Sequence, residues 1–239
     1  MSFPVEKLYI AIRLVHQAGL LPVFCIAIHK AGFEEKAASL FKRYYGFDDS
    51  DFSFRVVWID PCDVEYNFLK YLDFGGKNAI FGRAGGDWDK LREPIENLYL
   101  ESFEMHFVEG KPWSKTPLYS RAERRLEKGK NVINVDPDGS VMDRFENVER
   151  LYESLKENGY IPRLEKNWRY EDEYGHSLSG VRIPDEPRIA VGSKGELMHI
   201  DGGSHRLALA QILDIDRIPA VVQLEHEDWD GELEVIEEL

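Results

Sequence analysis

The chain has 239 residues, of which 43% are hydrophobic and 31% are charged, enough apolar material for one large or two small domains. Its 44 acidic and 30 basic residues give a formal charge of -14, and such a field repels phosphate backbones, which argues against non-specific nucleic-acid binding. The two cysteines, Cys25 and Cys62, form no metal-binding pattern and favour a reducing, cytoplasmic setting. The apolar run 20–28 is about half the length of a bilayer span, so we expect no transmembrane segment.

The first 50 residues have the pattern of a helical N-terminal region. Apolar residues recur at helical spacing over residues 6–18, and a second helix is predicted from Phe33 to Tyr45, ending near Gly46. The polar stretch 48–53 then has the composition of a linker. We therefore expect residues 1–50 to be an addition to the main domain.

The next segment begins with a strand and continues into loop-rich sequence. Residues 54–59 are β-branched and aromatic, and Asp60-Pro61 predicts a turn after them. Residues 75–89 contain two glycine pairs and end in Gly86-Asp87-Trp88-Asp89. The two carboxylates of this motif are candidates for a metal or substrate site, but Asp87 as a helix cap and Trp88 as a core residue explain the motif more simply.

Helical patterns follow over residues 93–110 and 119–128, separated by a proline-rich break at residues 111–117. Trp113 and Thr116 lie in this break, where they are candidates to close over a ligand pocket. The second helix carries a basic cluster that is interleaved with glutamates. This arrangement is typical of a solvated helix face and not of a nucleic-acid site.

Residues 143–159 form the best-marked helix in the sequence. Asp143 and Glu146 have capping-box spacing, and Gly159 suits a left-handed C-cap. An apolar stripe runs along one side of the helix and consists of Phe145, Val148, Leu151 and Leu155. The following residues, 163–187, are polar and rich in glycine and proline, so we expect a long loop.

A compact unit of strands and one helix comes next. Residues 188–191 and 196–200 are predicted strands joined by a hairpin at 192–195. The turn Asp201-Gly202-Gly203 leads into a helix over residues 204–213, and residues 218–224 form the next strand. An acidic tail follows and makes residues 227–239 a separate segment.

The glycine turn before this helix is a candidate anion site. Helix N-termini carry backbone N–H groups without intrahelical partners, and Gly202 and Gly203 allow the backbone to approach a ligand closely. Ser204 can cap the helix or donate to a phosphate oxygen. His205 and Arg206 add a switchable and a fixed positive charge in the first turn. A plain strand-to-helix turn with His205 and Arg206 at the surface explains the same spacing.

The sequence from Asp201 to Ala210, followed by the strand Ile218-Pro219-Ala220-Val221-Val222, resembles the ParB/sulfiredoxin superfamily. Members of this family share a G-x-H-R or G-x-R-R turn, an alanine-rich helix and an I-P-V strand. The segment 151–160 is similar to the family's preceding helix. The resemblance implies an α/β (α+β) domain with a small mixed sheet over residues 54–226, in which residues 62–142 form an insertion.

The resemblance also implies a phosphate or nucleotide bound at residues 201–206. A sulfiredoxin reaction lacks its nucleophile, because Ser204 stands where that branch has cysteine. We expect no DNA-binding domain after the unit, in contrast to chromosome-partitioning ParB proteins. The branch typified by a free serine kinase fits best and implies a phosphotransferase acting on a small hydroxyl compound, with ATP or ADP and Mg²⁺ as cofactors and CTP as a further candidate.

Phosphoryl transfer needs charge neutralisation, a cationic clamp and a base for the acceptor hydroxyl. His205 and Arg206 are the candidates for the first role, and Glu65 and Asp63 for the base, although exposed turn carboxylates explain the latter pair more simply. Asp201 is a candidate Mg²⁺ ligand or a helix cap. A ParB-like nuclease or nucleotide hydrolase, and a non-catalytic nucleotide-switched binding module, remain alternatives. The sequence does not indicate an oligomeric state.

Overall fold

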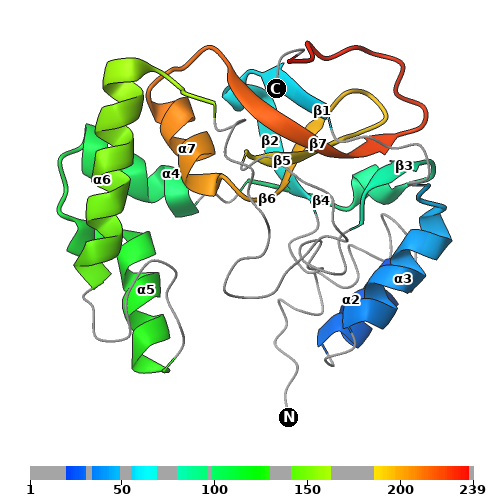
Figure 1. Cartoon of the computed structure of the whole chain (residues 1–239). Helices are drawn as coiled ribbons and strands as arrows, with labels where there is room; N and C mark the ends of the chain where they lie inside the picture. The colour runs from blue at the N-terminus through cyan, green and yellow to red at the C-terminus, as the bar shows by residue number, and fades with distance from the viewer. Residues whose placement is uncertain are drawn as a thin grey trace.

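The computed structural model describes residues 20–30, 34–48, 55–68, 80–95, 98–129, 141–162 and 186–236. The helix predicted over residues 6–18 and almost all of the linker at 48–53 and the loop at 163–187 lie outside these ranges. Within them the fold is a mixed α/β arrangement built on a seven-stranded open sheet (Figure 1).

The sheet brings together strands from distant parts of the sequence. The strand order is β1-β7-β5-β6-β2-β4, and β3 pairs with the end of β7. The pairing is antiparallel for β1–β7, β5–β6 and β2–β4, and parallel for β5–β7, β2–β6 and β3–β7. The strands are β1 (Arg55–Ile59), β2 (Val64–Phe68), β3 (Gly82–Ala84), β4 (Arg92–Pro94), β5 (Arg188–Val191), β6 (Leu197–Asp201) and β7 (Ile218–His226).

The central strands confirm the predicted compact unit. β5 and β6 form the antiparallel hairpin, and β7 is buried along its whole length because strands flank it on both sides and helices cover the sheet. β7 continues to His226, two residues beyond its predicted end. Glu225 and His226 therefore belong to the sheet.

The helices are α2 (Leu20–Lys30), α3 (Glu34–Tyr45), α4 (Leu98–Phe103), α5 (Pro117–Glu127), α6 (Val141–Asn158) and α7 (Ser204–Ile212). α3 and α7 lie where the sequence predicts them, and α5 begins two residues earlier than expected. The pattern at residues 93–110 is only partly helical, because β4 occupies its start and one π-helical turn, Glu104–Val108, follows α4.

The helix α6 confirms its predicted apolar stripe. Phe145, Val148 and Leu155 are buried, and Gly159 ends the helix with a φ of 69°. The expected capping role of Asp143 is wrong, because the helix begins two residues earlier, at Val141.

The two faces of the sheet have separate cores. α2 and α3 pack on one face, where Phe41 and Trp88 meet Met198 and Leu224. α7 covers the other face through Leu207 and Ala210, while its opposite side packs against α4, α5 and α6. α7 is therefore enclosed between the sheet and an outer helical layer (Figure 1). No helix among the described residues is long and apolar enough to cross a membrane.

Candidate anion-binding site

The turn between β6 and α7 has the backbone geometry of a helix N-terminus. Gly202 and Gly203 both adopt left-handed conformations, with φ of 72° and 59°. The N–H of Leu207 donates to the Gly203 carbonyl over 2.9 Å, which closes the first turn of the helix. The amides of Ser204 and His205 precede this bond, in the positions that have no acceptor within a helix. The turn therefore presents backbone donors and the positive end of the helix dipole.

Two contacts fix the turn in place. The ring Nε2 of His199, a buried residue of β6, donates to the Gly202 carbonyl over 2.7 Å. Gly203 lies directly on Pro187, where an added Cβ would come 2.7 Å from Cγ and 2.9 Å from the backbone nitrogen. Gly203 is thus required by packing as well as by its φ. His199 therefore has a structural role at this turn.

Arg206 lies at this turn in a buried ion pair. Its Nη1 donates to Glu186 Oε2 over 2.8 Å, and the hydroxyl of Tyr160 donates to the same oxygen over 2.5 Å. The side chain of Glu186 is fully buried and that of Arg206 is 8% exposed. Burial, and the neighbouring Glu186 carboxylate, raise the pKa of Tyr160 far above its usual value, so the tyrosine stays a hydrogen-bond donor. The alternative of a plain turn with Arg206 at the surface is wrong, because Arg206 is buried.

Two further arginines that the sequence analysis missed lie near the turn. Arg188 opens β5 and is buried, and a Cβ on Gly202 would lie 3.6 Å from its Nε. Arg144 comes from α6, and its Nη2 lies 3.5 Å from His205 Nε2. The sequence signal for Arg188 is a charged residue at the start of an otherwise apolar strand. Nothing in the local sequence distinguishes Arg144 from other charges on its helix.

His205 does not act as a switchable cation near neutral pH. Burial, and then the charges of Arg144 and Arg206, lower the pKa of His205 to about 4. Its ring packs edge-on against Tyr99 and Phe103, with centroid distances of 4.9 and 5.8 Å. The neutral ring can accept a hydrogen bond from Arg144. His205 therefore orients a cation and does not supply one.

Glu65 lies away from the turn. It is an exposed residue of β2, and the adjacent Val64 pairs with Leu197 at the start of β6. The turn follows the other end of β6, four residues on, which is about 13 Å along a strand. Asp63 is equally exposed, and Gln211 near the end of α7 bonds to the carbonyl of nearby Pro61. The structure does not bring either candidate base to the amino end of α7.

The metal predictions have no counterpart in the described geometry. Asp201 is the last residue of β6, and its side chain lies outside the described part of the structure. Among the residues with described side chains, no three His, Cys, Asp or Glu groups lie close enough to hold a metal ion. A role of Asp201 in binding Mg²⁺ stays a prediction.

The motif at residues 86–89 contributes to the structure of the core, as the simpler of the two interpretations predicts. Trp88 is fully buried, and its Nε1 donates to the Ala84 carbonyl over 2.8 Å. Asp89 is also buried and accepts hydrogen bonds from the Ser193 amide at 3.0 Å and the Ser193 hydroxyl at 2.6 Å. Asp87 pairs with Lys90 and caps no helix through its side chain. The motif ties the β5–β6 hairpin to the core.

Trp113 and Thr116 are structural as well. Trp113 is buried beneath α6 and donates from Nε1 to Glu149 over 2.8 Å. Thr116 caps α5, accepting from the Tyr119 amide and donating to the Trp113 carbonyl. The basic cluster on α5 confirms the solvated helix face, since Arg121, Arg124, Arg125 and Lys128 are exposed.

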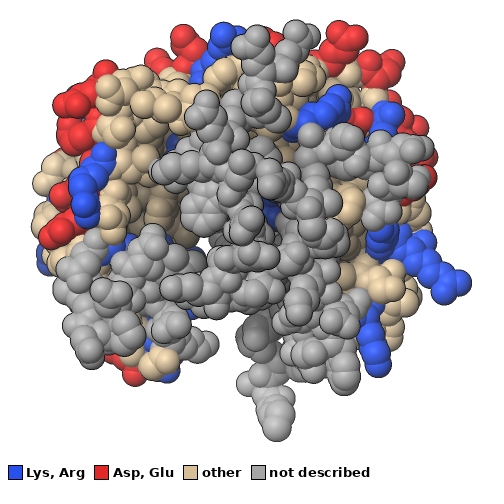
Figure 2. Space-filling model, in the orientation of Figure 1, with Lys and Arg blue, Asp and Glu red and all other residues tan. Residues whose placement is uncertain are grey.

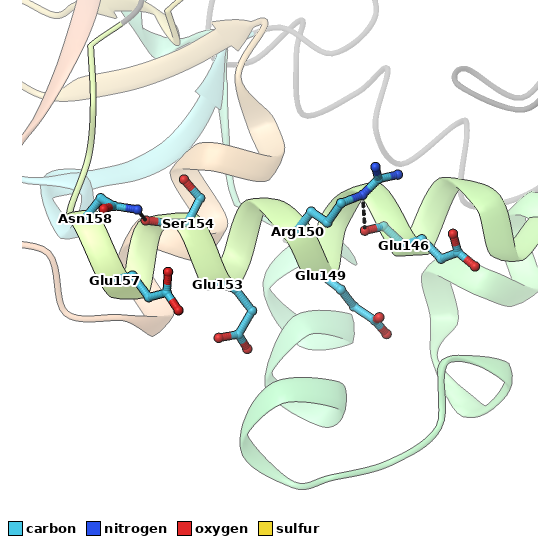
Figure 3. A pocket seen from close by; sticks show the side chains of 7 residues that line it. All are labelled: Glu146, Glu149, Arg150, Glu153, Ser154, Glu157 and Asn158. Atoms are coloured by element: carbon cyan, nitrogen blue, oxygen red, sulfur yellow. Dashed lines mark hydrogen bonds between the residues drawn. The ribbon is translucent and has the colours of Figure 1, made fainter.

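A shallow depression lies on the outer face of α6 and is separate from the turn (Figure 3). The carboxylates that line it come from one face of α6. Acidic residues gather over this helix in the space-filling view (Figure 2). The lining residues are Glu146, Glu149, Arg150, Glu153, Ser154, Glu157 and Asn158. The side chain of Arg150 bonds back to the Glu146 carbonyl and to Asn147, so this face is an ordinary hydrated helix surface.

Comparison of the chain with protein-family models, curated proteins and solved structures gives no match. The resemblance to ParB/sulfiredoxin proteins therefore stays a prediction. The functional argument rests on the geometry of the turn.

Proposed function

We propose that the protein binds the phosphate group of a small molecule, with a nucleotide as the first candidate, at the amino end of α7. The ligand oxygens would accept from the backbone amides of Ser204 and His205. Arg144, Arg188 and Arg206 would surround the anion. These three arginines lie at the turn together with the buried Glu186 carboxylate, which pairs with Arg206.

The observation that carries the proposal is the state of Arg144. Its Nε is buried and makes no hydrogen bond within the described parts of the chain, while its Nη2 points to His205 in the first turn of α7. A buried donor without an acceptor costs about 1–3 kcal/mol. An anion at the turn would remove this cost, and it would do so beside a helix N-terminus that also favours negative charge.

Transfer of a phosphoryl group to a small hydroxyl compound is the activity that we propose for this site, on the strength of the resemblance at residues 201–206. ATP or ADP with Mg²⁺ is the expected donor, and CTP is the next candidate. The arginines and the helix N-terminus would stabilise negative charge on the transferred group. The acceptor base has no assignment, because Glu65 and Asp63 lie at the opposite end of β6.

A non-catalytic module that changes state when it binds a nucleotide is the second candidate. The position of Glu65 favours it, since binding requires the cations of the turn but no base. The nuclease alternative has less support: the net charge of -14 opposes nucleic-acid binding, and the exposed basic helix α5 is interleaved with glutamates.

Ligand-dependent thermal stabilisation tests the binding proposal. Inorganic phosphate, ATP, ADP, CTP and GTP, each with Mg²⁺, are compared on wild type, Arg144→Gln and Arg150→Gln. Arg150 is an exposed arginine six residues further along α6, so it controls for charge and helix position. A ligand at a hundred times its dissociation constant adds about 2.7 kcal/mol to the free energy of unfolding.

We expect one nucleotide class to stabilise wild type and Arg150→Gln, with most of the shift lost in Arg144→Gln. Equal shifts in all three proteins, or no shift with any ligand, would contradict the site. Product formation then separates the two candidate functions: transfer of labelled phosphate to a hydroxyl acceptor supports the phosphotransferase, whereas stabilisation without product supports the binding module.

A further inference from the structure

The outer edge of β1 is covered by a short segment that lies far from it in the sequence. β1 is the last strand on its side of the sheet, and residues 233–236, here called the cover segment, run antiparallel to it. The Trp58 N–H donates to the Glu234 carbonyl over 2.8 Å, and the Ile236 N–H donates to the Val56 carbonyl over 2.9 Å. Figure 1 shows the chain leaving β7 and returning above the sheet to β1.

Side chains add little to this backbone contact. Arg217 lies over the Trp58 ring, 4.9 Å from its centroid, and contacts both carboxylate oxygens of Glu234 at 3.1 and 3.0 Å. Both partners of this ion pair are more than half exposed, so water screens it. Leu233 packs against the core cluster beneath, while Val235 is 42% exposed. The cover segment is thus held by two backbone hydrogen bonds, one screened ion pair and the partly buried side chain of Leu233.

The edge beneath the cover is complementary to itself. The groups that face outward are the Trp58 N–H and the Val56 carbonyl, one residue on either side of Val57. If a second β1 lay antiparallel with Val57 opposite Val57, each Trp58 N–H would meet the Val56 carbonyl of the other copy. Val57 pairs with Val235 in the same way in the present structure. Arg55, which pairs with Glu225 in its own chain, would lie opposite Ile59, so no like charges would meet.

We propose that the β1 edge is a homodimerisation surface that the cover segment keeps closed. Withdrawal of the segment exposes a β-branched and aromatic strand edge, and such edges pair with other chains unless they are covered. A second copy restores both lost backbone hydrogen bonds in one isologous contact with its two-fold axis at Val57. The cover segment therefore sets the balance between the monomer and a β1-paired dimer.

Proline substitution within the cover segment tests this. Ile236→Pro removes the N–H that bonds to Val56, whereas Val235→Pro removes an N–H that points away from β1 and serves as the matched control. Light scattering across a concentration series gives the dimer dissociation constant. We expect this constant to fall about tenfold in Ile236→Pro, equivalent to about 1.4 kcal/mol, and to stay at the wild-type value in Val235→Pro.

A charge reversal at two exposed positions, Arg217 and Glu234, gives the second measurement. Arg217→Glu sets two carboxylates together and is expected to favour the dimer, and Glu234→Arg in the same chain is expected to restore the monomer. The proposal is overturned if Ile236→Pro and Arg217→Glu, each folded by circular dichroism, keep the wild-type dissociation constant. It is also overturned if the paired reversal fails to restore that constant.

Discussion

At the scale of single residues, the most constrained group is Arg206. Its guanidinium and the Glu186 carboxylate are both buried, with Tyr160 bonded to the same oxygen. Such a pair positions a cation at the turn, but it also means that Arg206 serves the fold. Loss of ligand binding on substitution of Arg206 would therefore not by itself identify a binding residue, and Arg144 is the better test.

The buried pair gives the first prediction. Arg206→Met removes the arginine that pairs with the buried Glu186 carboxylate and should lower the free energy of unfolding by about 3–5 kcal/mol. Adding Glu186→Gln removes that charge, so the double variant should be more stable than Arg206→Met alone. Urea denaturation of the two single variants and the double variant completes the cycle, and simple additivity of the two losses would contradict the pairing.

The two glycines of the turn give a matched comparison. Both need a left-handed backbone, which costs a residue with a side chain about 1–2 kcal/mol. Only at Gly203 would a Cβ also collide with Pro187, whereas at Gly202 the nearest atoms lie 3.6 Å away. We expect Gly203→Ala to destabilise the protein by at least about 1 kcal/mol more than Gly202→Ala, measured by chemical denaturation. Equal costs would mean that the turn is not packed on Pro187.

His205 makes stability depend on pH in a defined direction. Its pKa is about 4 in the folded protein and near 6.5 when unfolded, so between these values the unfolded chain binds the proton more readily. The stability is fully present above about pH 6.5 and falls as the pH decreases towards 4. Compared with His205→Gln, the wild type should lose on the order of 2–3 kcal/mol more between pH 7.5 and 4. An NMR titration giving a pKa near 6.5 would contradict this.

At the scale of elements, local signals identified the pieces of the unit that holds the site. The hairpin of β5 and β6, the glycine turn, α7 and β7 follow from alternation, turn residues and helix composition over adjacent segments. The same logic failed over residues 93–110, where β4 precedes the helix. β4 is three residues long and is held by pairing with β2, so its cause lies elsewhere in the chain.

The helix α5 allows a test at this scale. Thr116 is fully buried and its hydroxyl both caps the helix and bonds to the Trp113 carbonyl. Thr116→Ala should lower the free energy of unfolding by about 1–2 kcal/mol, while Thr116→Ser keeps the hydroxyl and should lose less. Thermal denaturation of both variants provides the measurement. Equal losses would show that the methyl group, and not the cap, is responsible.

At the scale of the whole molecule, the strand order of the sheet could not be predicted from the sequence. Its central neighbours come from distant segments: β2 inserts beside β6, and β1 lies beside β7. This order places Glu65 at the far end of β6 from the turn, and it brings Arg144 on α6 to His205. Sequence spacing predicts the backbone of the candidate anion site and its Arg206, whereas Arg144 and Arg188 reach it only through tertiary packing.

The most direct test of the proposed site locates the anion on the backbone. Inorganic phosphate, and then the nucleotide that stabilises the protein most, is titrated into the ¹⁵N-labelled protein, and amide chemical shifts are followed by NMR. Binding at the amino end of α7 predicts that the largest saturable changes occur at Gly203, Ser204 and His205 and are lost in Arg144→Gln. Saturable changes confined to other parts of the chain, or no changes at any accessible concentration, would contradict the account.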